Sequence, residues 1–148
     1  MNGNKSNPPR TGNYGGDHRG RRDFTPPADP IKDEWITQAI NDDAIAYCDK
    51  YGKTLSKKGL TTSQIRNFYG EVMRIKGRGF DREEEAVLML RPKLAYATFR
   101  KGSEGSKMLK EILDPALKLA AKDAKAFHNF CQMFEALLAF HKAYGGRD

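Results

Sequence analysis

The chain has 148 residues, and its 26 Lys and Arg against 19 Asp and Glu give a net charge of +7. This length predicts one domain, and the positive balance favours an anionic partner, most often nucleic acid. No apolar run reaches the ~18 residues that a membrane span requires, and the N-terminus lacks a hydrophobic signal core, so a cytoplasmic location is expected.

The first 29 residues are rich in Gly, Pro, Asn and Arg and almost lack aliphatic side chains. Such a segment buries too little apolar surface to offset its ordering entropy. Residues 1–29 are therefore predicted to be a disordered basic tail, and residues 30–148 a single helical-bundle domain. The run Arg19-Gly20-Arg21-Arg22 faintly resembles RGG-type RNA-binding tails, although a solvated arm without function explains it better.

The first two helices are predicted from capping signals and apolar spacing. One runs from Asp29-Pro30, an N-cap followed by a proline, to Gly52. The next begins at Thr61 and Gln64, which match a capping box, and ends at Gly77. Their inward faces are expected to be Ile36, Ile40, Ala44 and Tyr47 in the first helix, and Ile65, Phe68, Val72 and Ile75 in the second.

The second half of the chain is also helical in pattern. A third helix opens with the acidic run after Asp81 and ends at Gly102, with a kink or break expected at Pro92. A short helix should follow over residues 103–113, and Asp114-Pro115 should cap a long last helix that ends at Gly145. The expected inward residues are Leu94, Tyr96 and Phe99 in the third helix, and Leu117, Ala121, Ala124, Phe127, Cys131, Phe134 and Leu138 in the last. The prediction is an all-α, compact bundle of about five helices.

Signatures of catalysis are missing from the sequence. There is no Gly-Lys-Ser/Thr phosphate loop, no H-E-x-x-H and no C-x-x-C pair. His128 and Cys131 could supply half a metal site, but two core-lining residues are the better interpretation, and Cys48 is expected to be a buried thiol as well. The three acidic side chains at residues 83–85 point in different directions around a helix, so they cannot all face one metal ion. A solvated first turn is the better interpretation. The sequence predicts no enzyme activity, no cofactor and no metal.

Positive charge is concentrated between residues 50 and 110, where 15 Lys and Arg accompany 6 Asp and Glu. Arg66, Gly70 and Arg74 share one helix face opposite the predicted buried stripe, so that two guanidinium groups flank a bare glycine where a phosphate could approach. The amides of residues 61–63 form a natural anion site at the start of that helix. An ordinary solvated basic face explains the same spacing equally well.

Residues 60–66 also resemble the opening of a helix-turn-helix recognition helix, so a DNA-binding regulator is the alternative function. That motif requires a helix and a 3–4-residue turn immediately upstream. Residues 52–60 are interpreted as a longer basic loop, which argues against this alternative.

Three blocks resemble the small helical subunit of type III-A CRISPR (Csm) effector complexes. They are Leu60-Thr61-Thr62-Ser63-Gln64-Ile65-Arg66-Asn67, Arg91-Pro92-Lys93-Leu94-Ala95-Tyr96-Ala97, and the segment from Phe127 to Tyr144. The resemblance implies a non-catalytic subunit that stacks with its own copies as a filament, beside backbone subunits and a large cyclase-bearing subunit. It also implies that the chain holds target RNA, paired with guide RNA, through the sugar–phosphate backbone.

The predicted RNA-binding residues come from two sources: the basic residues on and before the helix that begins at Thr61, and positions in or beside the three blocks that resemble the Csm subunit. Tyr96 is expected either in the core or facing RNA, and Glu135 is expected to pair with a basic neighbour. The candidate RNA-binding residues are Lys53, Lys57, Lys58, Thr62, Ser63, Arg66, Arg74, Lys93 and Arg100.

Overall fold

The computed structural model describes residue 3 and residues 27–100 and 102–148, which contain six α-helices, one short 3-10 helix and no strand. The all-α prediction is confirmed, and nearly all of the predicted tail lies outside the described residues. The elements are α1 (Asp33–Thr37), α2 (Asp42–Lys57), α3 (Thr62–Arg78), η2 (Phe80–Arg82), α4 (Glu84–Arg100), α5 (Glu104–Ala120) and α6 (Ala124–Ala143).

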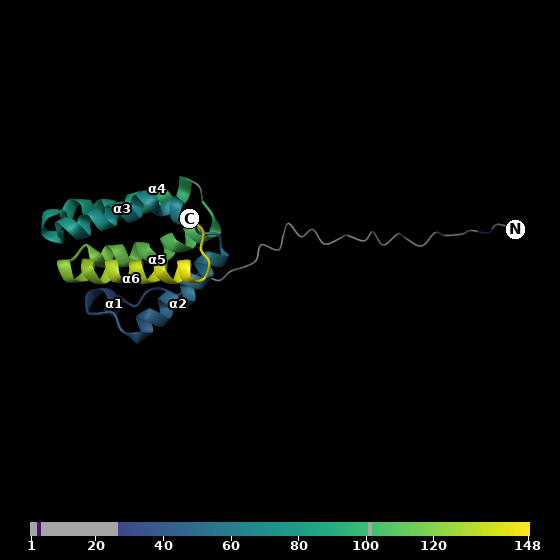
Figure 1. Ribbon diagram of the computed structural model, residues 1–148, viewed down its shortest axis with the longest axis horizontal. Coiled ribbons are helices and arrows are strands. Elements are labelled where there is room, and N and C mark those ends of the chain that lie inside the picture. Colours follow the sequence, from purple (N-terminus) through teal and green to yellow (C-terminus); the bar gives the residue numbers. More distant parts are fainter. Residues whose placement is uncertain (1–2, 4–26, 101) are drawn as a thin grey trace.

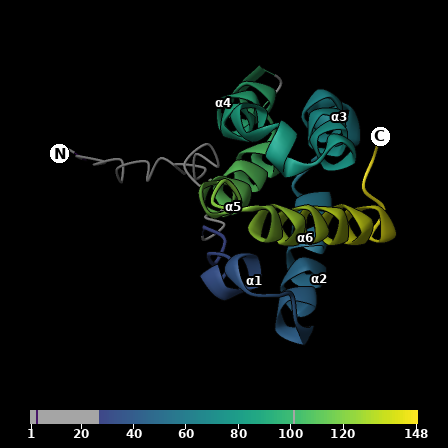
Figure 2. The same cartoon turned by 90° about the vertical axis from the view of Figure 1, so that its left-hand side faces the viewer.

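The helices lie in three layers (Figure 1 and Figure 2). Helices α3 and α4 form one outer layer, α5 and α6 the middle layer, and α1 with α2 the opposite outer layer. Helix α2 packs mainly on α6, whereas α4 packs on both α3 and α5. The α3–α4 layer therefore presents one broad side to solvent.

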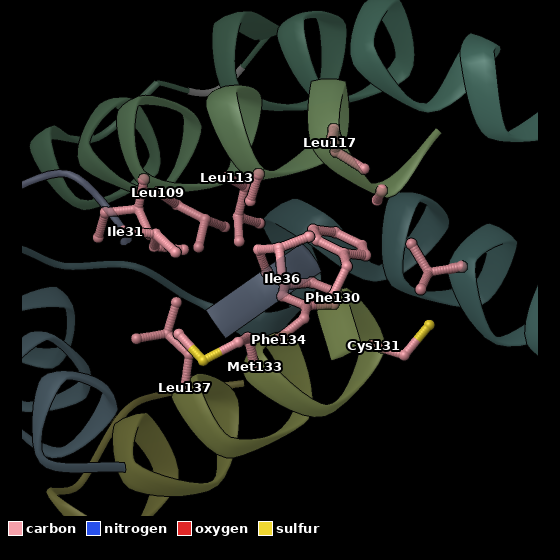
Figure 3. Packing of buried hydrophobic residues seen from close by; sticks show 14 of the residues in the cluster. Ile31, Ile36, Leu109, Leu113, Leu117, Phe130, Cys131, Met133, Phe134 and Leu137 are labelled. Carbon is pink, nitrogen blue, oxygen red and sulfur yellow. The ribbon is translucent and has the colours of Figure 1, made fainter. Parts of the chain in front are cut away.

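The core is built around the aromatic residues of α6 (Figure 3). Phe130 and Phe134 are fully buried, and their rings stack with centroids 6.0 Å apart. Ile36 from α1 and Leu113 from α5 pack around them. Burial of large apolar side chains from every layer against α6 is the main stabilising contribution to such a bundle.

The single predicted first helix is wrong, because two helices occupy its place. Helix α1 ends at Thr37, and Asn41 starts α2 by accepting the amide of Ala44 at 3.0 Å. The side chain of Asn129 in α6 donates to the carbonyl of Ile36 at 2.9 Å, which satisfies the open end of α1. The apolar spacing across residues 36–47 would fit one continuous helix, but the cap formed by Asn41 divides it into two.

Gly52 does not end a helix but lies buried inside α2. A Cβ atom at this position would stand 2.5 Å from the Cβ of Phe140 in α6. The glycine therefore permits close approach of α2 and α6, which is the usual reason for a glycine in a helix interior. The capping box of α3 and its four-residue buried stripe are confirmed, although the glycine that follows the last helical residue is Gly79, with φ 97°, rather than Gly77.

Both internal prolines lie within continuous helices. Helix α4 runs through Pro92, which excludes the break but not the kink of the prediction, and α5 runs through Pro115, so Asp114-Pro115 does not start the last helix. Asp123 starts α6 instead by accepting the amide of Ala126 at 2.8 Å. The carboxylate of Asp114 pairs with Arg91 of α4 at 3.0 Å rather than capping a helix.

Candidate nucleic-acid interface

The outer face of α3 carries the predicted phosphate-binding residues. Arg66, Gly70 and Arg74 are all exposed and lie opposite the buried stripe, as the helical spacing indicates. A Cβ atom added to Gly70 would meet nothing within 4 Å. The backbone of α3 is therefore accessible between the two arginines.

The two arginines differ in their partners. Arg74 donates to Glu71 at 2.7 Å and to Glu83 at 3.0 Å, so two carboxylates already neutralise its guanidinium. Arg66 makes no ion pair within the described part of the chain. Of the two, only Arg66 is available for a phosphate without breaking an existing contact.

Glu71 and Glu83 sit at the centre of this ion-pair network. A hydrogen bond from Arg74, with help from Lys93 at 3.3 Å, lowers the pKa of Glu71 from 4.5 to about 2. Glu83 also accepts from Arg78 at 2.7 Å, and its side chain is largely buried. The prediction of a solvated acidic turn is therefore wrong for Glu83, which precedes α4 and holds two arginines.

The predicted anion site at the start of α3 is largely filled by the chain itself. The amide of Thr61 donates to the side chain of Gln64 at 3.1 Å, and the amide of Thr62 donates to the carbonyl of Arg147 at 3.0 Å. The hydroxyl of Thr62 donates to the carboxylate of Asp148 at 3.3 Å. Two of the three amides expected to bind an anion are thus already used.

A groove of about 620 Å³ lies between α3 and α4, and is called the α3–α4 groove. It brings together three of the predicted residues, Ser63, Lys93 and Arg100. Arg100 has no ion-pair partner among the described residues, and Tyr96 as a whole residue is 64% exposed. Tyr96 is therefore not a core residue. The lining comprises Ser63, Gln64, Asn67, Phe68, Glu71, Pro92, Lys93, Tyr96, Ala97 and Arg100.

A second groove, of about 410 Å³, lies on the other side of α3 against α6, and is called the α3–α6 groove. Thr62 and Arg66 line it together with Tyr69 and Lys142. Five of the nine predicted residues thus lie in two grooves that flank one helix, whereas Arg74 and the three lysines before α3 line neither groove. Sequence reasoning did not identify Asn67 or Lys142, because neither groove is visible before the packing of α3 between α4 and α6 is known.

The three lysines before α3 lie at the end of α2. The ammonium group of Lys53 stands 5.6 Å from the ring centroid of Tyr144. Lys58 pairs with Glu104 at 3.5 Å, whereas Lys57 is exposed and makes no ion pair in the described residues. Lys57 is therefore the lysine of this group that can bind a phosphate without giving up a contact with another described residue.

The sequence offered a few residues as possible metal ligands or reactive groups, and the structure places each of them. No group of three His, Cys, Asp or Glu among them is arranged to hold a metal ion. Cys48 and Cys131 are buried free thiols, as predicted, and burial raises the pKa of each to about 12. His128 is exposed, so its predicted core position is wrong. Glu135 pairs with Lys76 at 3.0 Å, which confirms the expected basic partner.

The sequence argument against a helix-turn-helix protein is wrong in one respect. Residues 52–57 belong to α2, so only residues 58–61 separate α2 from α3. This is the turn length that the motif requires. The carboxylate of Asp148, however, lies at the N-terminal turn of α3, where a recognition helix would have to approach DNA.

The fold and its surface define a small, basic, all-helical protein with cation-lined grooves on both sides of one exposed helix. No described helix is both long and apolar enough to cross a membrane. The profile of the family described as Csm2 Type III-A matches residues 39–147, and the chain belongs to this family. It is therefore a small subunit of type III-A Csm complexes.

A relative from Streptococcus thermophilus carries the description "CRISPR system Cms protein Csm2". It is 35% identical to this chain over 118 residues, which cover 69% of this chain and 93% of the relative. No solved structure matches the chain.

Proposed function

We propose that this chain is a non-catalytic RNA-binding subunit of a type III-A CRISPR ribonucleoprotein. Several copies stack as a filament beside the backbone subunits and the large cyclase-bearing subunit, in the cytoplasm. Together they hold target RNA, paired with guide RNA, through its sugar–phosphate backbone. Cleavage and signalling belong to the neighbouring subunits. Membership of the Csm2 family supports the assembly part of this proposal.

The open face of α3 is the observation that carries the RNA part. Arg66 has no ion-pair partner in the described residues and stands one turn from Gly70, over which the helix backbone is bare. Arg100, Lys57 and Lys53 are the other predicted cations that are without an ion pair in this part of the chain, and Lys53 instead stands over the ring of Tyr144. A phosphate backbone needs charge and shape rather than base-edge donors, because sequence is read by guide–target pairing.

The ion pairs rank the candidate residues for an experiment. Arg66 and Arg100 should contact phosphate directly, whereas Arg74 and Lys93 are held by glutamates. Of these two, only Lys93 lines the α3–α4 groove. Arg74→Ala is therefore a matched control for Arg66→Ala, since both remove one exposed arginine from the same helix face.

The test is a salt titration of target-RNA binding by reconstituted complexes. Arg66→Ala and Arg100→Ala should each weaken binding about equally for all guide and target sequences. Each should also reduce the slope of log affinity against log salt by about 0.7–0.9 for every phosphate that the variant no longer binds. Arg74→Ala should change the slope by much less. Unchanged slopes in both Arg66→Ala and Arg100→Ala complexes would contradict the proposal.

A DNA-binding regulator remains the alternative function, because α2, residues 58–61 and α3 have the required lengths. The two functions differ in their preferred ligand. A free subunit that binds one palindromic duplex far more tightly than random duplexes would favour the regulator. Co-purification with a short processed RNA and several larger subunits would favour the effector subunit.

A further inference from the structure

The chain turns back after α6 and lies against the start of α3 (Figure 2). Gly145 has a φ of 86°, which lets the backbone reverse directly after the helix. The carbonyl of Arg147 then accepts the amide of Thr62 at 3.0 Å, beside a parallel bridge between Thr61 and Arg147. Residues 145–148 are called the C-terminal strap, and backbone hydrogen bonds join this strap to both α6 and α3.

The middle of the strap packs on a buried histidine. A Cβ atom added to Gly146 would overlap the ring of His141, which is fully buried. The amide of Gly146 donates to the carbonyl of His141 at 2.8 Å. Nε2 of the same ring lies 2.6 Å from the carbonyl oxygen of Leu60, just before α3. The glycine at position 146 thus lets one histidine connect the strap to the start of α3.

Asp148 brings a carboxylate to polar groups that line the α3–α6 groove. It accepts a hydrogen bond from the hydroxyl of Thr62 at 3.3 Å and forms an ion pair with Lys142. The hydrogen bond from Lys142 lowers the pKa of Asp148 most, and the charge of Arg66 lowers it further. Thr62 and Arg66 are among the residues proposed to bind RNA. An acidic group of the chain itself therefore lies where a phosphate is expected.

A phosphate bound to these groups would bring its negative charge close to the carboxylate of Asp148, and like charges at short distance repel. We propose that the C-terminal strap is autoinhibitory: Asp148 competes with an RNA phosphate for polar groups of the α3–α6 groove, and RNA binding displaces it. The groups in question are those of Thr62, Arg66 and Lys142. This competition rests on the proposed function, because it requires the RNA contact at Arg66.

The contacts of Asp148 are weak enough for RNA to displace them. Its side chain is 82% exposed, and exposed ion pairs shift an equilibrium by only a few fold. Displacement of the strap also frees the amide of Thr62 in the first turn of α3, where the helix dipole favours an anion. Removing the carboxylate should therefore raise the affinity for RNA modestly, and locking the strap in place should lower it.

The first experiment compares target-RNA binding by reconstituted complexes at one salt concentration. Asp148→Asn should tighten binding about two- to five-fold, because it removes the competing charge and keeps the size of the side chain. Asp43→Asn is the matched control and should leave the affinity unchanged, since it raises the net charge equally but alters an exposed residue in the first turn of α2. Equal tightening by both variants, or none by Asp148→Asn, would overturn the proposal.

Arg66→Ala separates the strap from the proposed function. Where Arg66→Ala weakens RNA binding but Asp148→Asn has no effect, the strap is refuted and the RNA contact stands. Where Arg66→Ala has no effect, the RNA contact itself is contradicted, and the competition with it. Combined with Arg66→Ala, Asp148→Asn should tighten binding less than it does alone, because one of the contested groups is gone.

The second experiment locks the strap in place. Thr61→Cys and Arg147→Cys together place two thiols across the bridge, within reach of a disulfide. Mild oxidation should weaken RNA binding about two- to five-fold relative to the reduced form of the same variant, in which the strap can leave. Both forms share the substitutions, so the loss of the Thr61 cap cancels. Arg147→Cys alone is the control and should bind RNA equally before and after oxidation. Equal affinities of the locked and reduced forms, or failure of the disulfide to form, would refute the strap.

Discussion

At the scale of single residues, ion pairs decide which basic side chains are available. The sequence places Arg66 and Arg74 in equivalent positions on α3, yet their environments differ. Glu71 and Glu83 hold Arg74, while nothing in the described residues forms an ion pair with Arg66. Glu71 lies within the same helix as Arg74, but Glu83 lies beyond the end of α3. The second contact depends on the fold, so helical spacing alone did not reveal it.

The pKa of Glu71 reports directly on this network. Because Arg74 lowers this pKa to about 2, the contribution of Glu71 to stability is present above pH 4.5 and disappears as the pH falls through 2. Arg74→Ala should raise the pKa of Glu71 toward 4.5, as measured by NMR titration of its carboxyl carbon. Lys93→Ala is the control and should raise it less, since Lys93 contributes less than Arg74. An unchanged pKa in Arg74→Ala would contradict the geometry.

The two cysteines make a second prediction at this scale. Burial raises the pKa of Cys48 and Cys131 from 9.0 to about 12, so the native thiols should react slowly with a thiol reagent near neutral pH. The unfolded chain, as the positive control, should react quickly. Stability should hold below about pH 9 and decline as the pH rises toward 12, because only the unfolded thiols ionise in that window. Rapid labelling of the native protein would show that the thiols are accessible.

At the scale of elements, the sequence predicted a helix boundary correctly where a local cap sets it, and not where a tertiary contact does. The capping box at Thr61 and the start at Ser103 were correct because a cap is a local interaction between neighbouring residues. Gly52 and Asp114-Pro115 were misread as boundaries because their roles are set by tertiary contacts, with α6 and with Arg91 respectively. The exposed Phe99 was misread for a related reason. Apolar spacing does not distinguish a helix face that is buried in the core from one that is exposed, as Phe99 is.

Of the candidate interface, the sequence correctly predicted the exposed face of α3 but not the two grooves beside it. Arg66 and Gly70 could be placed from helical periodicity, since both lie opposite a clear buried stripe. The grooves arise where α4 and α6 pack against α3, and that packing brings together residues far apart in the chain. Asn67 and Lys142 were therefore not predicted.

Two glycines allow a matched test of helix packing. Gly52→Ala should lower the free energy of unfolding by about 1–3 kcal/mol, because its methyl group would overlap Phe140. Gly70→Ala should raise it by about 0.5–1 kcal/mol, because the site is open and alanine favours the helix. Chemical denaturation of both variants measures the difference. Equal effects of the same sign would show that α2 and α6 are not in close contact at Gly52.

At the scale of the whole molecule, the three layers separate stability from binding. Helix α6 and its neighbours supply the aromatic core, while α3 and α4 expose cations, grooves and several large apolar side chains on the outer side. Substitutions on that side should alter assembly or RNA binding with little effect on stability, because exposed charges contribute little to folding. The opposite side is closed by α1 and α2, and by residues 27–32, which precede α1.

That preceding segment sets the minimal folded chain. The hydroxyl of Tyr47 donates to the carbonyl of Asp29 at 2.6 Å, the amide of Asp29 donates to Tyr51 at 2.7 Å, and Ile31 is buried. A chain that begins at Pro27 should therefore melt within roughly 2 °C of the full chain, as the composition of the preceding residues predicts. A chain that begins at Lys32 lacks the buried isoleucine and both hydrogen bonds, so its melting temperature should fall on the order of 10 °C. Calorimetry of the two truncated chains beside the full chain measures both effects. A large decrease in the melting temperature on removal of residues 1–26 alone would show that these residues pack on the bundle. An unchanged melting temperature for the chain that begins at Lys32 would show that Asp29 and Ile31 contribute nothing to stability.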